Sequence, residues 1–189
     1  MLYVIENGVI TAKHVSPDDI ATSVLAVSHF YTGILPSYTL WYSRKELYPE
    51  TALYFPPATR KVAVAVEAFK PPERYTIPTP GLIFICSPGQ APRVFAVKKR
   101  PENEDSLLFN APYFNVYMDG RTCQGTQTYC QDIRQIPEEF FLSFFSLHML
   151  GKRSKSHPDS LIALWRELDG KEEYPMDDLE PYGPVTGVL

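Results

Sequence analysis

The stretch "KVAVAVEAFKPPERYTIPTPGLIFIC", residues 61–86, decides the class of fold. It contains two short apolar runs, "VAVAV" and "LIFI", which a proline-rich segment separates. β-Branched and aromatic residues favour strands, and prolines between such runs are typical of turns. Because both runs are apolar throughout, we expect them to be central strands of a sheet.

Similar runs lie on both sides of this stretch, from about Tyr38 to Lys98. They read "YTLWYS" and "TALYF" before it, and "RVFAV" after it. The connections are short, and an antiparallel meander is the simplest way to join strands by short loops. The sequence shows no repeat period and no strand–helix alternation of the kind that predicts a parallel sheet.

The N-terminal residues predict a hairpin followed by a helix. In "LYVI-ENG-VITA" two apolar arms flank Asn7-Gly8, a strong hairpin-turn dipeptide. Ser16 is a suitable N-cap, and Pro17 is tolerated at the first helical position. The predicted helix stops at about Gly33.

Two more helices are predicted after the strands. The first begins at Pro137 and runs through "FFLSFFSLHML" to Gly151. The second begins near Pro158 and runs through "LIALWREL" to Gly170. A helix, a strand meander, a loop and two helices, in this order, predict an α+β fold.

The length of 189 residues suits one globular domain overall, because it can build one full-sized core but not two. Within it we expect three parts. They are an N-terminal hairpin and helix in residues 1–34, a core in residues 35–170, and an acidic C-terminal tail in residues 171–189.

Composition and charge exclude several classes of protein. A net charge of −4 argues against a nucleic-acid-binding face, and the basic patches at 98–100 and 152–155 are expected to be solvated turns. Polar residues 6–8 interrupt the first apolar run, so no signal peptide is predicted, and no run approaches the ~20 apolar residues that span a bilayer. Three cysteines make no disulfide framework. We expect a cytoplasmic protein with free thiols that binds neither nucleic acid nor a membrane.

The segment "NVYMDGRTC", residues 115–123, could carry chemistry. A cysteine nucleophile needs access to its substrate and a group that stabilises the charge developing on the attacked carbonyl. The amide of Asn115 could be that group for Cys123, and one such donor is worth roughly 3 kcal/mol of transition-state energy. In a regular hairpin with Asp119-Gly120 as a two-residue turn, however, Asn115 and Cys123 would be diagonal neighbours on opposite faces. Their cooperation therefore requires a bulged or irregular loop.

Structural roles explain the other reactive side chains equally well. A cysteine is often a small buried apolar residue. We expect this role for Cys86, and it is an alternative to a catalytic role for Cys123. Cys130 could be a resolving thiol for Cys123. His148 and His157 lie in or beside the C-terminal helices, where a packed or capping role is expected. No pair of cysteines or histidines has zinc spacing, and no glycine-rich phosphate loop is present, so we expect no metal and no cofactor.

The spacing in this segment resembles the signature of ubiquitin-conjugating enzymes. That signature is His-Pro-Asn, then a glycine five residues after the asparagine and the acceptor cysteine eight residues after it. Here 120 − 115 = 5 and 123 − 115 = 8. The longer string "LLFNAPYFNVYMDGRTCQGT", with "EEFFLSFFSLH" and "LIALWRELDG" after it, resembles the prokaryotic ubiquitin-conjugating-like family D, also called the PRTRC system protein B family. The resemblance runs from about Leu35 to the C-terminus.

The resemblance implies a ubiquitin-conjugating-enzyme-like fold and a transferase activity. Cys123 would accept the C-terminal glycine of a ubiquitin-like protein as a thioester, and Asn115 would stabilise the oxyanion when a nucleophile attacks it. Gly120 would supply the turn beside Asp119. The implied partners are a ThiF-type ubiquitin-activating-like enzyme and a small ubiquitin-like protein, encoded nearby and often on plasmids or other mobile elements.

The sequence also departs from that signature. Tyr113-Phe114 replaces His-Pro, so the packing that aims the asparagine differs, and Gln124-Gly125 follows the cysteine. No residue is carried over for guiding an incoming lysine, although Tyr129 and Asp132 are nearby candidates. The alternative function is a non-catalytic binding or scaffold module with the same fold, for which a buried Cys123 would be evidence. A cysteine hydrolase ranks third, because no convincing histidine partner is present.

Overall fold

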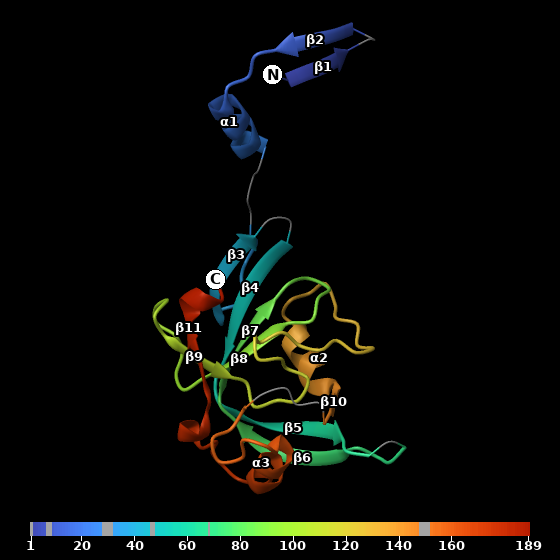
Figure 1. The fold of residues 1–189 in the computed structure, drawn as a ribbon, viewed down its shortest axis with the longest axis vertical. Coiled ribbons are helices and arrows are strands. Elements are labelled where there is room, and N and C mark those ends of the chain that lie inside the picture. Colours follow the sequence, from blue (N-terminus) through green and yellow to red (C-terminus); the bar gives the residue numbers. More distant parts are fainter. Residues whose placement is uncertain (1, 7–8, 28–31, 46–47, 68, 148–151) are drawn as a thin grey trace. The chain divides into compact units, whose positions relative to one another are not determined.

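The computed structural model describes residues 2–6, 9–27, 32–45, 48–67, 69–147 and 152–189. The chain divides into two compact units, Met1–Leu35 and Pro36–Leu189. Figure 1 shows the elements of both units.

The first unit is a hairpin and a helix, as predicted. Strands β1 (Leu2–Glu6) and β2 (Val9–Lys13) pair antiparallel, with Glu6 opposite Val9. This register leaves two residues for the predicted Asn7-Gly8 turn, which itself lies outside the described residues. Helix α1 (Pro17–Val27) follows, and the Asp19 N–H donates to Ser16 Oγ at 3.0 Å while the Ser16 N–H donates to Asp19 Oδ2 at 3.0 Å. This reciprocal capping fixes the predicted start of the helix. The described helix ends at Val27, residues 28–31 lie outside the described residues, and Gly33, the predicted stop, is not helical.

A six-stranded antiparallel sheet forms the centre of the second unit. Its order is β11-β9-β8-β7-β4-β3. The strands are β3 (Thr39–Lys45), β4 (Tyr48–Phe55), β7 (Gly81–Cys86), β8 (Arg93–Val97), β9 (Leu107–Asn110) and β11 (Pro181–Pro184). The "LIFI" run lies in β7, which pairs with β4 and β8 and is buried along its whole length. The prediction of a central strand there is confirmed.

A second, three-stranded sheet interrupts the predicted meander. Strands β5 (Ala58–Ala65) and β6 (Glu73–Thr79) pair antiparallel, and β10 (Phe144–Ser146) pairs parallel to β5 on its other side. The "VAVAV" run is therefore also central, but in this smaller sheet. Four strands, β6, β9, β10 and β11, were not predicted.

The helix predicted from Pro137 to Gly151 is wrong beyond its first two turns. Helix α2 covers Ile136–Leu142, and β10 follows after one residue, while residues 148–151 lie outside the described part of the chain. The Ser143 hydroxyl bonds the Phe140 carbonyl at 2.6 Å and so helps to close the helix. Parallel pairing with β5 then outweighs the helical preference of the apolar run. The last predicted helix is confirmed as α3 (Leu161–Leu168).

Aromatic rings fill the space between the large sheet, α2 and α3. Phe84 of β7 meets Phe140 of α2 at 5.4 Å between ring centroids, and Tyr113 lies 5.4 Å from Phe140 and 5.9 Å from Trp165 of α3. The helix α2 thus lies against one face of the large sheet (Figure 1). Such edge-to-face pairs stabilise a core beyond their buried area.

The C-terminal residues cover the other face of the large sheet. Val185 and Val188 pack against Ile83, Ile85 and Phe95 in a second buried cluster. The segment expected as an acidic tail therefore contributes an edge strand, β11, and part of the core. It also contains two 3-10 turns, η1 (Met176–Asp178) and η2 (Val185–Gly187). The predicted α+β class is confirmed, with sheets that are mostly antiparallel.

None of the helices in the described ranges is long and apolar enough to cross a membrane.

Candidate active site

An irregular hairpin carries Asn115 and Cys123. The Tyr117 N–H donates to the Arg121 carbonyl at 2.7 Å, and the Cys123 N–H donates to the Asn115 carbonyl at 2.6 Å. Between them Val116 forms a bridge with Thr122. The turn therefore contains three residues, 118–120, and not the two of the regular hairpin.

This extra turn residue shifts the pairing by one position. Asn115 now lies directly opposite Cys123, whereas a two-residue turn would have paired Cys123 with Val116. Three-residue turns of this kind end in a residue with left-handed backbone, and Gly120 has φ of +81°. The irregular loop that cooperation of Asn115 and Cys123 requires is therefore present.

Gly120 is also held against the central sheet. Its carbonyl accepts the Val94 N–H of β8 at 2.7 Å, and a Cβ atom at Gly120 would lie 2.3 Å from Cζ of Phe95. Beside it, Asp119 accepts the Arg121 backbone N–H at 3.0 Å and Nε at 2.6 Å. Burial opposes ionisation of Asp119, but these hydrogen bonds outweigh it and hold its pKa below the ordinary value. The turn is thus fixed by the sheet on one side and by an ion pair on the other.

The side chain of Asn115 is oriented by strand β10. Its Oδ1 accepts the Ser146 hydroxyl at 2.8 Å and the Ser146 backbone N–H at 3.4 Å. A backbone N–H only donates, so the amide oxygen must face Ser146 and the NH₂ group remains for another acceptor. Asn115 itself has φ of +63°, which is uncommon for a residue with a side chain.

The two residues before Asn115 are anchors in the core. Tyr113 and Phe114 are 1% and 2% exposed, and Phe114 lies 4.9 Å from the ring of Trp165. Trp165 Nε1 donates to the Pro112 carbonyl at 3.0 Å. Burial raises the pKa of Tyr113, so its hydroxyl stays protonated. Neither ring lines the cavity beside the cysteine, but both fix the backbone from which Asn115 projects.

Cys123 is exposed, and a cavity of about 250 Å³ lies beside it. Asn115, Tyr129 and Ser146 line this cavity together with the polar segment 124–127. The cavity therefore brings an accessible thiol and an oriented amide to one place. This is the geometry that a nucleophilic cysteine needs at a carbonyl.

The other cysteines are less accessible. Cys86 is fully buried, as predicted, and burial raises the pKa of its thiol. Cys130 is half-buried, and its Sγ donates to the Asp132 carbonyl at 3.1 Å. Burial and a hydrogen bond with Glu139 raise the pKa of the Cys130 thiol. Cys123 is thus the exposed member of the three.

Of the two candidates for guiding a lysine, the structure brings only Tyr129 to the cavity. Tyr129 is buried, and burial together with the nearby charge of Glu139 raises its pKa to about 12. Asp132 is not among the lining residues. Its carboxylate is bound by Arg134 at 2.6 Å, which lowers the pKa of Asp132 to about 2. His157 pairs with Glu167 at 3.3 Å and is not a lining residue either, while His148 lies outside the described residues.

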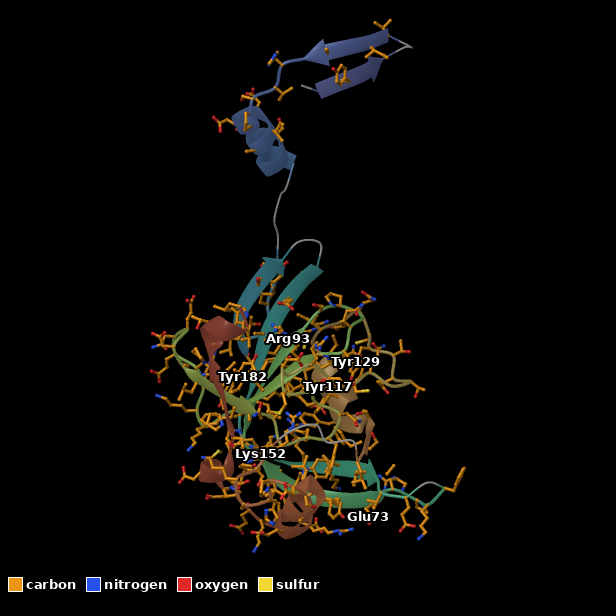
Figure 2. The ribbon with its side chains drawn as sticks, viewed as in Figure 1. Glu73, Arg93, Tyr117, Tyr129, Lys152 and Tyr182 are labelled. Carbon is orange, nitrogen blue, oxygen red and sulfur yellow. The ribbon has the colours of Figure 1, made fainter. Side chains whose placement is uncertain are left out.

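Three residues near the site were not predicted to belong to it. Tyr117 projects beside Cys123, Ser146 holds Asn115, and the fully buried Arg153 donates to the Val116 carbonyl. The expectation that the patch at 152–155 is a solvated turn is wrong for Arg153, whose burial lowers its pKa to about 10. Figure 2 labels Tyr117 and Tyr129 in this part of the second unit. An alternating pattern along residues 115–117 would have indicated Tyr117, whereas the predicted helix concealed Ser146.

Comparison with known proteins identifies a family. The family model for prokaryotic E2 family D matches residues 20–182. No curated protein and no solved structure matches the chain.

Proposed function

Since the chain belongs to prokaryotic E2 family D, we propose that it is a ubiquitin-conjugating-like carrier. It accepts a ubiquitin-like protein on Cys123 as a thioester and transfers it onward. The observation that carries this proposal is the pairing of an exposed Cys123 with Asn115 across a three-residue turn. A module that only binds a partner has no need of an accessible thiol opposite an oriented amide.

Loading is an exchange of one thioester for another. The Cys123 thiolate attacks the carbonyl carbon at the C-terminus of the ubiquitin-like protein, which arrives as a thioester on an activating enzyme. A bond forms between the Cys123 sulfur and this carbon, and the bond to the enzyme's own sulfur breaks. The exchange is nearly neutral in energy and requires no cofactor, so the protein's task is to position the reacting groups.

Discharge uses Asn115. When an amine attacks the carbonyl carbon, negative charge develops on the carbonyl oxygen. The Asn115 NH₂ group, oriented by the two bonds from Ser146 to Oδ1, donates to this oxygen. One such donor contributes roughly 3 kcal/mol to transition-state stabilisation.

The remaining site residues hold Cys123 and Asn115 in position. Gly120 and Asp119 hold the turn that places Cys123 opposite Asn115, and buried Tyr113 and Phe114 take the place of His-Pro in anchoring the strand before Asn115. The specific ubiquitin-conjugating arrangement of helices and sheet belongs to this proposal.

The proposed partners follow from the family. They are a small ubiquitin-like protein and a ThiF-type activating enzyme, in the PRTRC system of a plasmid or other mobile element. All of these components act in the cytoplasm.

A non-reducing gel tests the proposal. The full chain is mixed with the neighbouring activating enzyme, the ubiquitin-like protein and ATP, using wild type, Cys123→Ala, Cys123→Ser and the matched control Cys130→Ala. We expect a reductant-sensitive adduct with wild type and Cys130→Ala, and none with Cys123→Ala. Cys123→Ser should give an adduct that resists reductant but is cleaved by alkali, since a serine oxygen forms an ester.

An adduct that persists in Cys123→Ala would contradict the assignment of Cys123. If no variant forms an adduct while the wild type co-elutes with the ubiquitin-like protein, the alternative of a non-catalytic binding module is correct.

A further inference from the structure

A tyrosine without a role in the proposed function faces the same sulfur. Tyr117 pairs with Arg121 through the bond of 2.7 Å, and Cys123 pairs with Asn115 through the bond of 2.6 Å. In an antiparallel pair, residues two positions apart on one arm project from the same face as the residues opposite them. Tyr117 is therefore the diagonal neighbour of Cys123 on the same face of the hairpin. The residue between, Val116, is buried on the other face.

In this contact the Tyr117 hydroxyl is suited to donate a hydrogen bond to the Cys123 sulfur. Interaction with the Cys123 side chain, through hydrogen bonding and through the negative charge of a thiolate, raises the pKa of Tyr117, which agrees with their diagonal placement on the hairpin. A phenol with a raised pKa keeps its proton at neutral pH. It can donate to the sulfur, but it does not accept a proton as a base.

Resting on the thioester function above, we propose that Tyr117 is a catalytic residue whose hydroxyl donates to the Cys123 sulfur whenever that sulfur carries negative charge. In loading, it holds the thiolate beside the cavity before attack. In discharge, the amine nitrogen attacks the carbonyl carbon, the C–N bond forms, the C–S bond breaks, and the electron pair leaves on the Cys123 sulfur. Tyr117 stabilises this leaving thiolate and keeps its own proton, while the proton of the amine passes to solvent.

Replacing Tyr117 by phenylalanine removes the hydroxyl and leaves the other ionisable groups around the sulfur in place. These are Asp119 on the turn, Arg121 on the arm after it, Tyr129 on the cavity wall, Glu139 next to Tyr129, and Arg153 at the Val116 carbonyl. Tyr117 is 36% exposed, so removal of its hydroxyl oxygen opens no cavity in the core. The matched control is Tyr182→Phe, because the Tyr182 hydroxyl makes none of the described hydrogen bonds and its ring contact with Phe95 at 4.8 Å is retained.

The first experiment needs no partner protein. Alkylation of Cys123 by iodoacetamide is followed at pH 6.5 and pH 9.5 in the full chain, by mass spectrometry of the peptide that contains it. Only the thiolate reacts, so a donor that stabilises the thiolate raises the rate at pH 6.5 relative to that at pH 9.5. We expect this ratio to fall about fivefold in Tyr117→Phe and to stay unchanged in Tyr182→Phe. An equal ratio in wild type and Tyr117→Phe overturns the proposal.

The second experiment measures discharge. Wild type and Tyr117→Phe are loaded, and release to free lysine is followed in a single turnover over a range of lysine concentrations. We expect the maximal rate to fall about fivefold, with the lysine concentration for half-maximal rate unchanged. A wild-type discharge rate in Tyr117→Phe overturns the catalytic role. If the alkylation ratio falls but the wild type never forms a thioester, the stabilisation of the Cys123 thiolate by Tyr117 stands and the thioester function fails.

Discussion

Gly120 explains the spacing of the motif in physical terms. Asn115 to Tyr117 is one arm, the next three residues are the turn, and Arg121 to Cys123 is the other arm. The last turn residue has the left-handed backbone, so the glycine stands five residues after Asn115. The residue that faces Asn115 across the pair is then the eighth.

Substitution of this glycine should destabilise the protein strongly. In Gly120→Ala the new Cβ meets the Phe95 ring at 2.3 Å and φ is unfavourable. We expect the free energy of unfolding in urea to fall by about 3 kcal/mol. Gly125→Ala is the control, since its φ of +55° is also left-handed but no atom lies within 4 Å of its Cβ. It should lose about 1 kcal/mol, and equal losses would show that Phe95 yields.

Ser146 should affect chemistry more than stability. In Ser146→Ala the Asn115 amide keeps only the 3.4 Å bond from the backbone N–H. We expect thioester discharge to free lysine to slow roughly fivefold, against about a hundredfold in Asn115→Ala. Ser143→Ala is the matched control, because Ser143 lines the same cavity but bonds the Phe140 carbonyl. A discharge rate as slow in Ser143→Ala as in Ser146→Ala would contradict the orienting role.

Strand β10 places Phe145 and Leu142 in opposite environments. In a continuous helix these two residues, three positions apart, would lie on the same face. Phe145 is 1% exposed and packs against Tyr113, Phe140 and Trp165, whereas Leu142, at the end of α2, is 79% exposed. Phe145→Ala should lower the free energy of unfolding by about 4 kcal/mol. Leu142→Ala should lower it by less than about 0.5 kcal/mol. Comparable losses in the two variants, measured by urea unfolding, would favour the helix.

Long apolar elements were predictable, and short or proline-bearing strands were not. β7 and α3 were found because their apolar patterns are strong and their ends are marked by glycine or proline. β6 contains Pro78 and β11 contains two prolines and a glycine, which ordinarily exclude a strand. β10 has only three residues, and its pairing with β5 across the fold leaves no local trace.

In the candidate site, too, local sequence patterns were predictable and contacts between distant segments were not. Residue types and spacing singled out Asn115, Gly120 and Cys123 as candidates, and the structure places all three on one hairpin. The three-residue turn was not expected, because Asp119-Gly120 is the usual sign of a two-residue turn. Ser146 was missed because the role of its hydroxyl depends on a strand contributed from 31 residues away.

Both faces of the large sheet are covered by chain from the C-terminal half. α2 lies against one face through the contact of Phe140 with Phe84, and the last residues cover the other face through Val185 and Val188, while α3 packs on β6 of the smaller sheet. Asp178 fastens this final segment, since its buried carboxylate accepts the Ser156 N–H at 2.7 Å. The segment after α3 is therefore part of the folding unit.

This carboxylate should make stability depend on pH. Burial opposes ionisation of Asp178, but hydrogen bonds from Ser154 and Ser156 prevail and lower its pKa. A lowered pKa in the folded state contributes stability above the unfolded value of about 4, and this contribution is lost as pH falls further. Between pH 7 and pH 3, Asp178→Asn should therefore lose less unfolding free energy than wild type does. The exposed Asp105, changed to Asn, is the control and should behave as wild type; an unaltered pH difference in Asp178→Asn would exclude this role.

The hydrogen bond from the Cys123 N–H to the Asn115 carbonyl makes the exchange of this amide proton a measure of local opening. An amide proton held in this way exchanges with solvent deuterium only when the bond breaks. The exchange rate of this single proton therefore records how often the hairpin opens beside the proposed acceptor cysteine. A ubiquitin-like protein that binds the closed hairpin would slow that exchange. Its binding and release could therefore be followed without measuring the transfer reaction.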